Sequence, residues 1–139
     1  MSENERTIYA VTAIIRNEHG QTLLLKRNES SYHNYWQFPE GKIDKGETEL
    51  AAIKRELNEE IGADSLKLTR LGRHACPFMF HGISVTLDRM IYKTSKPKKI
   101  TLSDEHSEYG WFSSKDLDFI KLIPGVKDIV AQYIVEREM

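Results

Sequence analysis

A 23-residue segment that begins at Gly41 constrains this chain more than any other part of its sequence. The segment reads GKIDKGETELAAIKRELNEEIGA and fits the pattern G-x5-E-x7-R-E-U-x-E-E-x-G-U, in which U is a bulky aliphatic residue. Glycine and each charged residue type make up roughly 6–7% of ordinary sequence, so a chance match at one starting position is on the order of one in a billion. The fixed positions that match are Gly41, Glu47, Arg55, Glu56, Leu57, Glu59, Glu60 and Gly62. Ala63 is smaller than the last position prefers.

The second part of this segment, residues 48–61, is predicted to form a helix. It contains no glycine or proline, and alanine, leucine, lysine, arginine and glutamate dominate it. Thr48 suits the N-cap position, and Gly62 suits the position just after the end of a helix. The apolar residues recur on one stripe, which we expect to face the core. They are Leu50, Leu57 and Ile61, with Ile53 at the border of the stripe.

Three glutamates lie on a different face of the same predicted helix. Glu56, Glu59 and Glu60 are spaced i, i+3 and i+4, so their carboxylates are neighbours and repel one another. A hard divalent cation, which takes oxygen ligands, would compensate for that repulsion. Glu47 lies just before the helix and is expected to join the three glutamates from the loop. A solvated acidic face is the ordinary alternative, but the rest of the pattern favours a metal site.

This pattern is the signature of the Nudix hydrolases, and the chain resembles that family, in particular its MutT-like nucleotide pyrophosphohydrolases. The resemblance implies an α/β fold, the Nudix-type α/β/α sandwich with a mixed β-sheet between helices, in a single domain over residues 1–139. It implies hydrolysis of a phosphoric anhydride bond in a substrate whose diphosphate joins a nucleoside to a second group, with Mg²⁺ or Mn²⁺ as the cofactor. Divalent cations cancel the charge of the diphosphate and lower the pKa of bound water.

The resemblance also implies roles for individual residues. Glu56, Glu59 and Glu60 would hold the metal, and at Gly41 a backbone carbonyl oxygen would approach it. Arg55 would take part in catalysis by orienting a helix glutamate through a bidentate pair. The alternative for Arg55 is a surface ion pair with Glu59, one helical turn away.

The catalytic base is left open between two positions. In some members of the family a glutamate of the pattern serves as the base, which here is Glu56, and in others a later acid does. Glu105 is the later candidate, because it lies six residues before Trp111, where related sequences often carry an acid. Glu108 is its neighbour, and a polar loop without a catalytic role is the structural alternative for both.

Aromatic residues before the segment suggest where a substrate binds. Tyr35, Trp36 and Phe38 are candidates for a stacking surface, because every nucleobase offers a flat face to an aromatic ring. Packing beneath the loop is an equal alternative for these three residues. Arg27 is a further candidate for contact with the substrate.

Among possible substrates, a (d)NTP ranks first, including oxidised nucleotides such as 8-oxo-dGTP, with a nucleoside monophosphate and pyrophosphate as the products. Dinucleoside polyphosphates or RNA 5′ ends rank second, and ADP-ribose or nucleotide sugars third. Glu40 replaces the first glycine of a Gly-Gly pair, and the resemblance links that replacement to the second class. A catalytically silent nucleotide-sensing module is the remote alternative, although the pattern keeps every carboxylate.

The remaining chain alternates strand-like and helix-like segments. Apolar, β-branched runs predict strands at residues 8–16, 22–26, 66–74, 84–94 and 109–112, with the first two joined in a hairpin. Pro124 opens a last helix that is predicted to run through Val135. Strands interleaved with two main helices favour helices on both faces of a mixed sheet.

Composition limits the classes of function. The chain has 139 residues, a net charge of -1 and a pI of about 6.5, so it lacks the basic surplus of a general nucleic-acid binder. Its apolar runs are far shorter than the ~20 residues of a membrane span, and its polar N-terminus does not resemble a signal peptide. Cys76 is the only cysteine, which suits the cytoplasm and a buried, inert side chain. The expected partner is a small nucleotide without stable nucleic-acid or membrane binding, and a homodimer is left open.

Overall fold

The computed structural model describes residues 6–134 of the chain. Within this range the strands are β1 (Thr7–Arg16), β2 (Thr22–Arg27), β3 (Trp36–Gln37), β4 (Glu40–Lys42), β5 (Thr69–Phe80), β6 (Ile83–Ser95) and β7 (His106–Phe112). The helices are α1 (Glu49–Ile61), the 3-10 helix η1 (Ser114–Phe119) and α2 (Val126–Tyr133). Two predictions fall outside the described residues. They are the polar character of the N-terminus at residues 1–5 and the end of the last helix at Val135.

A single mixed sheet forms the middle of the molecule, with the strand order β3-β2-β1-β6-β5. β1 runs parallel to β6 over its whole length, from the pair Thr7 and Thr86 to the pair Arg16 and Ser95. It meets β2 antiparallel at Arg16 and Thr22, next to the connecting turn, and β2 then pairs along its length with β7. Beyond the turn, where β2 no longer pairs with β1, β4 pairs with β1 instead, opposite Ala10, Val11 and Thr12. The predicted hairpin between the first two strands is therefore present, but its strands separate beyond the turn.

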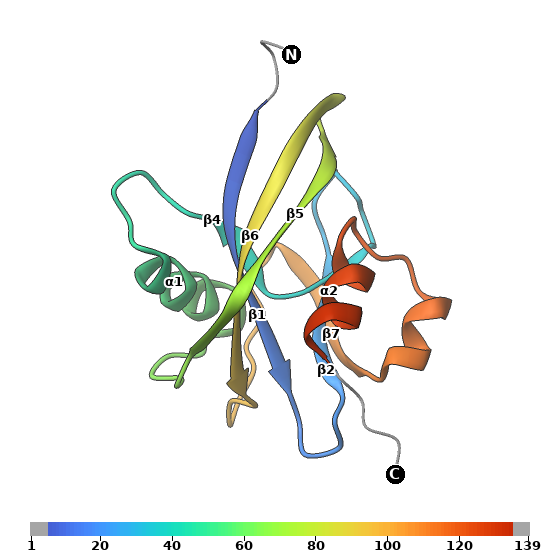
Figure 1. The fold of residues 1–139 in the computed structure, drawn as a ribbon. Coiled ribbons are helices and arrows are strands. Elements are labelled where there is room, and N and C mark those ends of the chain that lie inside the picture. Colours follow the sequence, from blue (N-terminus) through green and yellow to red (C-terminus); the bar gives the residue numbers. More distant parts are fainter. Residues whose placement is uncertain (1–5, 135–139) are drawn as a thin grey trace.

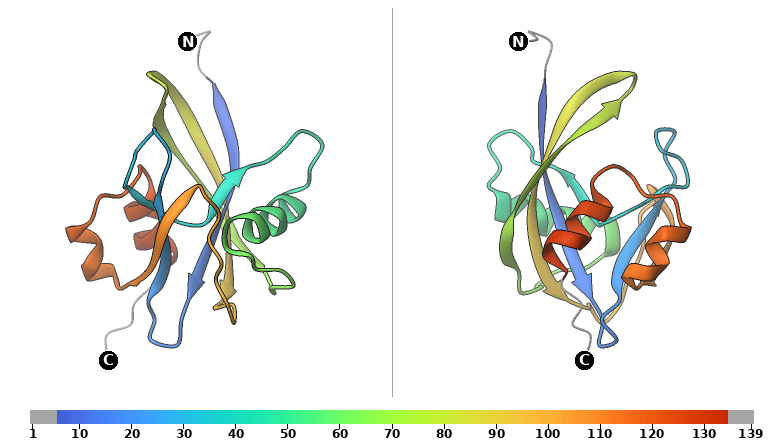
Figure 2. Two further views of the ribbon diagram at one scale, coloured as in Figure 1. Left: turned by 180° about the vertical axis from the view of Figure 1, so that it is seen from behind. Right: turned by 45° about the vertical axis from the view of Figure 1, so that its right-hand side comes forward.

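The sheet lies between helices, with α1 on one face and α2 on the other (Figures 1 and 2). Successive side chains of β1 point to opposite faces, because a strand has a period of two residues. Val11, Ala13 and Ile15 join the apolar cluster beneath α1, whereas Ile14 joins the cluster beneath α2. The layers are thus helix, sheet and helix, which confirms the predicted α/β/α sandwich.

The third and fourth predicted strands form one long hairpin, β5 and β6, around His81 and Gly82. Both turn residues have positive φ angles, 51° and 79°, as a tight reversal requires. β5 begins at Thr69 rather than at residue 66, and it continues to Phe80. Because β5 is an edge strand, Cys76 is half-buried rather than buried as predicted.

Two later elements also have boundaries that differ from the prediction. β7 begins at His106 rather than at residue 109, because His106 continues the pairing with β2 opposite Arg27. α2 begins at Val126 rather than at Pro124, because Gly125 is its N-cap in a left-handed conformation, with a φ of 93°.

The predicted ends of α1 are confirmed. The hydroxyl of Thr48 accepts a hydrogen bond of 3.1 Å from the backbone N–H of Ala51. Gly62 follows the helix in the left-handed conformation, with a φ of 68°, and its N–H donates back to the carbonyl oxygen of Asn58. These two caps determine which glutamates share a helical turn.

The predicted core stripe of α1 is wrong at Leu50, which is 44% exposed. The face towards the sheet is rotated so that Ile53 and Leu57 are fully buried or nearly so. This rotation also carries Glu60 into the interior, and the buried residues of α1 are therefore not all apolar.

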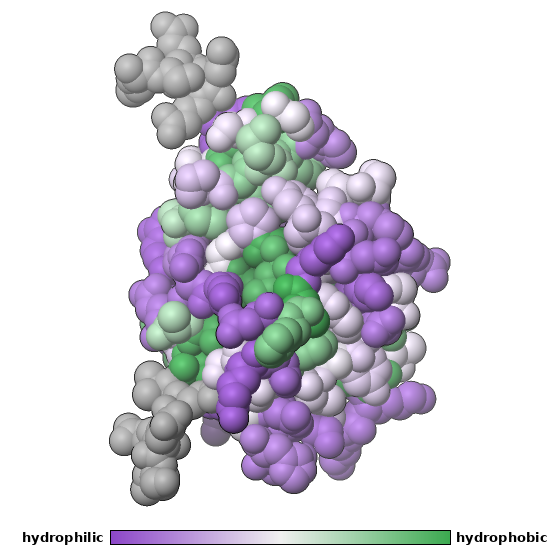
Figure 3. All heavy atoms as spheres, turned by 90° about the vertical axis from the view of Figure 1, so that its right-hand side faces the viewer, coloured by the Kyte–Doolittle hydropathy of each residue, from purple (hydrophilic) through white to green (hydrophobic). Residues whose placement is uncertain are grey.

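Figure 3 turns the right-hand side of Figure 1 towards the viewer, and a hydrophobic area lies at the centre of this face with hydrophilic side chains around it. α2 contributes Val126, Ile129 and Val130 to the cluster beneath it. None of the helices within residues 6–134 combines the length and apolar character of a membrane-spanning segment.

Candidate active site

A cavity of about 440 Å³ lies where α1, β4, the start of β7 and the tip of the β5–β6 hairpin come together. Glu56 and Glu60 of α1 line it together with Gly41 of β4. Glu105, from the loop before β7, and Arg27, at the end of β2, also line it. The fold thus brings candidate site residues from four separate stretches of the chain to one place.

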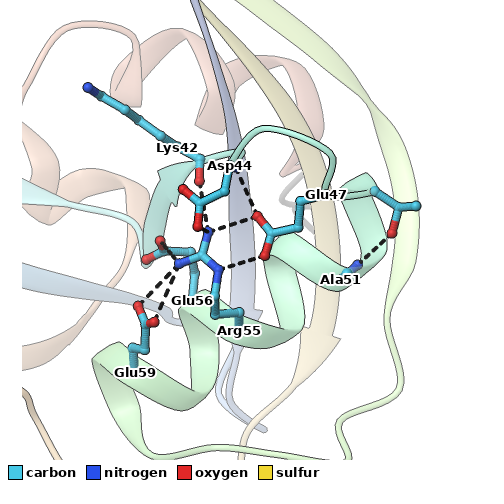
Figure 4. A network of polar contacts seen from close by, with 8 residues as sticks. Lys42, Asp44, Glu47, Ala51, Arg55, Glu56 and Glu59 are labelled. Carbon is cyan, nitrogen blue, oxygen red and sulfur yellow. Dashed lines mark hydrogen bonds and ion pairs between the residues drawn. The ribbon is translucent and has the colours of Figure 1, made fainter.

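Arg55 lies at the centre of a polar network on α1 (Figure 4). Its guanidinium donates two hydrogen bonds to Glu47, from Nε at 2.7 Å and from Nη2 at 3.0 Å. Nη1 donates to Glu56 at 2.7 Å and to Glu59 at 3.2 Å. Nη2 also donates to the carbonyl oxygen of Lys42 at 3.0 Å. The predicted bidentate pair therefore involves the loop residue Glu47, whereas the helix glutamates share Nη1.

Glu47 and Glu59 do not belong to the residues that line the cavity. The backbone N–H of Asp44 donates to Glu47 at 2.9 Å in addition to the bonds from Arg55. The hydrogen bond from Arg55, and after it the one from Asp44, lowers the pKa of Glu47 to about 2. The side chain of Glu59 is 57% exposed and turns towards Arg55. As the side chains lie here, Glu47 ties the loop before α1 to the helix.

Glu56 and Glu60 are carboxylates held largely away from water. Glu60 is 4% exposed, and the backbone N–H of Glu40 donates to it at 3.0 Å. Burial, and after it the charge of Glu56, raises the pKa of Glu60 well above its ordinary value. Burial also raises the pKa of Glu56, against the opposing effect of Arg55. Carboxylates in such an environment need a proton or a nearby cation to compensate for lost hydration.

Gly41 leaves room for the carboxylate of Glu56. A Cβ atom at residue 41 would lie 2.1 Å from Cδ of Glu56 and 2.3 Å from each of its carboxylate oxygens. No side chain fits at such distances, so the close approach of Glu56 to the backbone explains the glycine of the pattern. The result is a cradle in which carboxylate oxygens lie beside the backbone of β4.

The chemistry of these donors fits a hard divalent cation, because they are carboxylate oxygens beside an uncovered backbone. Within residues 6–134, no three acidic, histidine or cysteine side chains converge into a metal-binding group as they lie here. Glu56 and Glu59 are turned towards Arg55 instead. Metal binding by the three helix glutamates therefore requires side-chain rotation away from Arg55, and the buried charge of Glu60 favours such a cation.

Of the two later acids, Glu105 lines the cavity and Glu108 does not. Burial raises the pKa of Glu105. Its carbonyl oxygen accepts a hydrogen bond of 2.8 Å from the backbone N–H of Asn28, which holds its loop against the end of β2. Glu108 is exposed and lies 3.6 Å from Nζ of Lys26. Glu105 is therefore the one of the two that is placed to reach a ligand in the cavity.

Two of the three aromatic residues before β4 lie in the core and are not available for the predicted stacking surface. Phe38 has no exposed surface, and Trp36 is buried with it in the cluster beneath α2. The ring of Trp36 packs edge-on against Phe112, with centroids 4.9 Å apart. Tyr35 is half-buried and contacts Tyr32 of the same loop. The packing alternative applies to Trp36 and Phe38, because the chain around β3 turns them towards the core and not towards the cavity.

Arg27 lines the cavity, but its hydrogen-bond donors are engaged within the protein. Nε donates to the carbonyl oxygen of Ser31 at 2.9 Å, and Nη2 donates to the hydroxyl of Ser31 at 2.8 Å. Nη1 donates to Oε1 of Gln37 at 2.6 Å. Arg27 therefore supplies a fixed positive charge to the cavity wall.

Sequence reasoning missed a buried ion pair at the cavity, whose wall includes Glu40. Arg89 of β6 has no exposed surface, and its Nε donates to Glu40 at 2.9 Å. Its Nη2 donates to the carbonyl oxygen of Pro124 at 2.9 Å, and the hydroxyl of Thr12 donates to Glu40 at 2.8 Å. The backbone N–H of Glu40 also donates to Glu60, so this ion pair holds β4 next to the acidic residues of α1. An arginine among the apolar residues of β6 was the available signal.

His106 was also missed, and no motif marks it in the sequence. It is 5% exposed and lines the cavity, and neither ring nitrogen has a hydrogen-bond partner in the part of the chain that the structure describes. Burial, and after it the charge of Arg27, lowers the pKa of His106 to about 4. The ring is therefore uncharged at neutral pH. A buried polar side chain without a partner is uncommon in folded proteins and needs an explanation.

Comparison with known proteins defines the class to which this fold and site belong. Residues 6–133 match the family model described as NUDIX domain. The chain therefore belongs to the NUDIX family, which generally uses divalent metal ions.

Curated relatives are similar over part of the chain. An 8-oxo-dGTP diphosphatase of Haemophilus influenzae is 45% identical over 64 residues, which are 45% of this chain and 47% of that protein. An RNA pyrophosphohydrolase of Psychrobacter cryohalolentis is 52% identical over 52 residues, which are 37% of this chain and 28% of that protein. The chain thus spans less than half the length of these curated relatives.

Solved structures are similar over nearly the whole chain. The crystal structure of a MutT protein from Methanosarcina mazei Go1 has 28% identity and a TM-score of 0.77, and it covers 94% of this chain and 95% of its own. A C. elegans Ap4A hydrolase has 24% identity and a TM-score of 0.73, covers 91% of this chain and 94% of its own, and shares the fold.

Proposed function

We propose that this chain hydrolyses a phosphoric anhydride bond in a substrate whose diphosphate is linked to a nucleoside. Glu56, Glu59 and Glu60 would bind Mg²⁺ or Mn²⁺, with the carbonyl oxygen at Gly41 and the carboxylate of Glu47 as further donors. Such an ion, when bound, neutralises charge on the diphosphate and lowers the pKa of attached water. Membership in the NUDIX family and the acidic end of the cavity support this proposal.

The observation that carries the proposal is the buried pair of carboxylates, Glu56 and Glu60. Burial raises the pKa of both groups, and the charge of Glu56 raises that of Glu60 further. Uncompensated buried charges destabilise a fold, and apolar residues of similar volume would often be better for stability. Their presence beside the cradle at Gly41 is explained if the cavity receives a cation together with a negatively charged substrate.

Two carboxylates are candidates for the base that accepts a proton from the attacking water. Glu56 and Glu105 both line the cavity, and burial raises the pKa of both. A base works best when its pKa is not far below the working pH, so this shift favours proton transfer. As the side chains lie here, Nη1 of Arg55 holds Glu56 at 2.7 Å, and Glu56 would leave this bond to reach a cation. Glu105 would act as the base or as a supplementary ligand from outside the pattern.

For the substrate we propose a (d)NTP first, including an oxidised one such as 8-oxo-dGTP, cleaved to the monophosphate and pyrophosphate. The similarity to an 8-oxo-dGTP diphosphatase supports this choice. RNA 5′ ends or dinucleoside polyphosphates are the second choice, which the similarity to RNA pyrophosphohydrolases supports. ADP-ribose or a nucleotide sugar is the third.

We also propose that residues 1–139 act as one domain, in the cytoplasm, with a small nucleotide as the partner and without stable binding to a nucleic acid or a membrane. The match over residues 6–133 and the single cysteine support this assignment. Association of two copies into a homodimer stays an untested prediction.

An assay against a panel of substrates tests the proposed reaction. The protein is incubated with Mg²⁺ and either dGTP, 8-oxo-dGTP, diadenosine tetraphosphate, 5′-triphosphorylated RNA or ADP-ribose, and the products are separated by anion-exchange chromatography. We expect metal-dependent cleavage within the phosphate chain of at least one substrate, with a nucleoside monophosphate as the product from a (d)NTP. Nucleotide binding without cleavage of any substrate would support the sensing alternative instead.

A further inference from the structure

We propose that His106 forms a hydrogen bond to the nucleoside part of the substrate, in a subsite that Phe78 and Phe80 complete from the β5–β6 hairpin. The inference rests on the proposed function and adds which residues recognise the nucleoside. It also replaces the stacking surface that the sequence suggested, because Trp36 and Phe38 are buried in the core.

The unpartnered ring of His106 is the first observation. The side chain is 5% exposed and lines the cavity, and within residues 6–134 both of its nitrogens lack a hydrogen-bond partner. Burial of such a group without a hydrogen bond destabilises a fold, so a ligand that supplies the bond explains its placement. A neutral imidazole carries one donor and one acceptor nitrogen, and either can bond to a base edge or to a ribose hydroxyl.

The surroundings of His106 favour a neutral group over a phosphate. Arg27 is the neighbouring cation, and its donors are already engaged by Ser31 and Gln37. Glu40 also lines the cavity, and its negative charge acts on the ring of His106, which disfavours a phosphate at this position. In a nucleotide, the part that is uncharged and rich in hydrogen-bonding groups is the nucleoside.

The second observation is an aromatic wall on the hairpin. Phe78 and Phe80 are alternate residues of β5, so they point to the same face, and both line the cavity. The ring of Tyr32 packs on Phe78 with centroids 5.1 Å apart, and the ring of His81 packs edge-on against Phe80 at 4.4 Å. Nζ of Lys42 lies 5.0 Å from the centroid of Phe80. Braced aromatic rings of this kind are suited to stack on a nucleobase.

The cavity therefore has two chemically different parts. Glu56, Glu60 and Gly41 provide the acidic part, where the diphosphate and its cation would lie. Phe78 and Phe80 provide a flat apolar part, to which β1 and β6 add the paired residues Ile8 and Leu87. A nucleoside joined to a diphosphate matches this division, because it is flat and apolar at one end and highly charged at the other.

The test measures binding by the full chain in EDTA, so that neither a metal nor turnover contributes. The probes are dGMP, AMP and inorganic phosphate, and dissociation constants are measured by isothermal titration calorimetry. We expect His106→Leu and Phe80→Leu each to weaken binding of at least one nucleotide by about tenfold. The matched controls are His74→Leu, a β5 histidine away from the cavity, and Met79→Leu, on the exposed face of the hairpin, and both should leave binding unchanged.

A second measurement needs no variant and covers the case in which His106→Leu does not fold. The protein is labelled with ¹⁵N at its histidine side chains, and the ring resonances are recorded as nucleotide is added. We expect the ring nitrogens of His106 to shift with dGMP or AMP and not with inorganic phosphate.

Three results would overturn the subsite. They are nucleotide affinity equal to wild type in folded His106→Leu and Phe80→Leu, a ring of His106 that does not respond to nucleotide, and a ring that responds to phosphate alone. If at least one substrate of the panel is cleaved, each of these results overturns the subsite but not the proposed function. If the wild-type chain neither binds nor cleaves any nucleotide, the proposed function fails, and the subsite fails with it.

Discussion

The backbone at Gly41 and the carboxylate of Glu56 approach each other so closely that a Cβ atom at residue 41 would lie 2.1 Å from Cδ of Glu56. We therefore expect Gly41→Ala to displace this carboxylate and to lower turnover by about a hundredfold, because small misplacements of catalytic groups have effects of that size. Thermal unfolding should show that the variant still folds, since the displaced group is a side chain. Steady-state kinetics on the best substrate of the panel measures the loss.

Gly46→Ala is the control for this substitution. Gly46 has a φ of 81° and nothing within 4 Å of an added Cβ atom. The change should cost about 1–2 kcal/mol of stability through backbone strain and leave the turnover of the folded protein unchanged. Equal kinetic losses in the two variants would show that the effect of Gly41→Ala is not specific to Glu56.

Glu105→Gln and Glu108→Gln separate the two later acids. Glu105 lines the cavity, whereas Glu108 is exposed and close to Lys26. We expect Glu105→Gln to lower kcat more than it changes KM, because its proposed role concerns the attacking water or the metal. Glu108→Gln should have little effect, since exposed ion pairs contribute about 0–1 kcal/mol. A loss of turnover in Glu108→Gln alone would reverse the assignment, and no loss in either would leave Glu56 as the base.

His106 should make the stability of the metal-free protein depend on pH. Its pKa in the folded state is about 4, below the ordinary value of 6.5. The unfolded chain therefore binds more protons between these values, so the contribution of the neutral ring is complete above pH 6.5 and is lost as the pH falls towards 4. Urea unfolding in EDTA across this range should give a weaker pH dependence for His106→Gln than for wild type. His19→Gln, at an exposed position, should follow wild type.

The ion pair of Arg89 with Glu40 should behave as a buried unit. Arg89→Met leaves the carboxylate of Glu40 without its buried partner and should cost about 3–5 kcal/mol of stability. The double variant Arg89→Met/Glu40→Gln should recover most of that loss, because no uncompensated charge remains. A double-mutant cycle by urea unfolding measures the coupling, and additive effects would show that the two side chains act independently.

Local patterns explain why much of this structure could be predicted from the sequence. The caps at Thr48 and Gly62 depend on short-range hydrogen bonds and backbone conformation, and both are confirmed. Apolar, β-branched runs likewise predicted the strands, and their interleaving with two helices led to the mixed sheet between helices. The site could be predicted in part for the same reason. The pattern contains Glu56 and Glu60, and Glu105 was proposed to join them because it lies six residues before Trp111.

Contacts between distant parts of the chain could not be predicted in this way. The pair of Arg89 with Glu40 joins residues 49 positions apart, and no short pattern contains both. The burial of Trp36 and Phe38 depends on how the chain around β3 turns towards α2, which their own sequence does not determine. The same holds for Phe80, which reaches the cavity because the β5–β6 hairpin is longer than its predicted strands.

We propose that the buried carboxylate of Glu60 serves a bound cation rather than the stability of the fold. The most direct test is Mg²⁺-dependent turnover of the best panel substrate by wild type, Glu60→Gln and the exposed counterpart Glu59→Gln, together with their melting temperatures. We expect each substitution to lower turnover by at least about a hundredfold, because a metal site loses one charge. Glu60→Gln should melt at the same or a higher temperature, since burial penalises the ionised carboxylate and not the neutral amide. Near-normal Mg²⁺-dependent turnover by Glu60→Gln would show that Glu60 does not hold a catalytic cation.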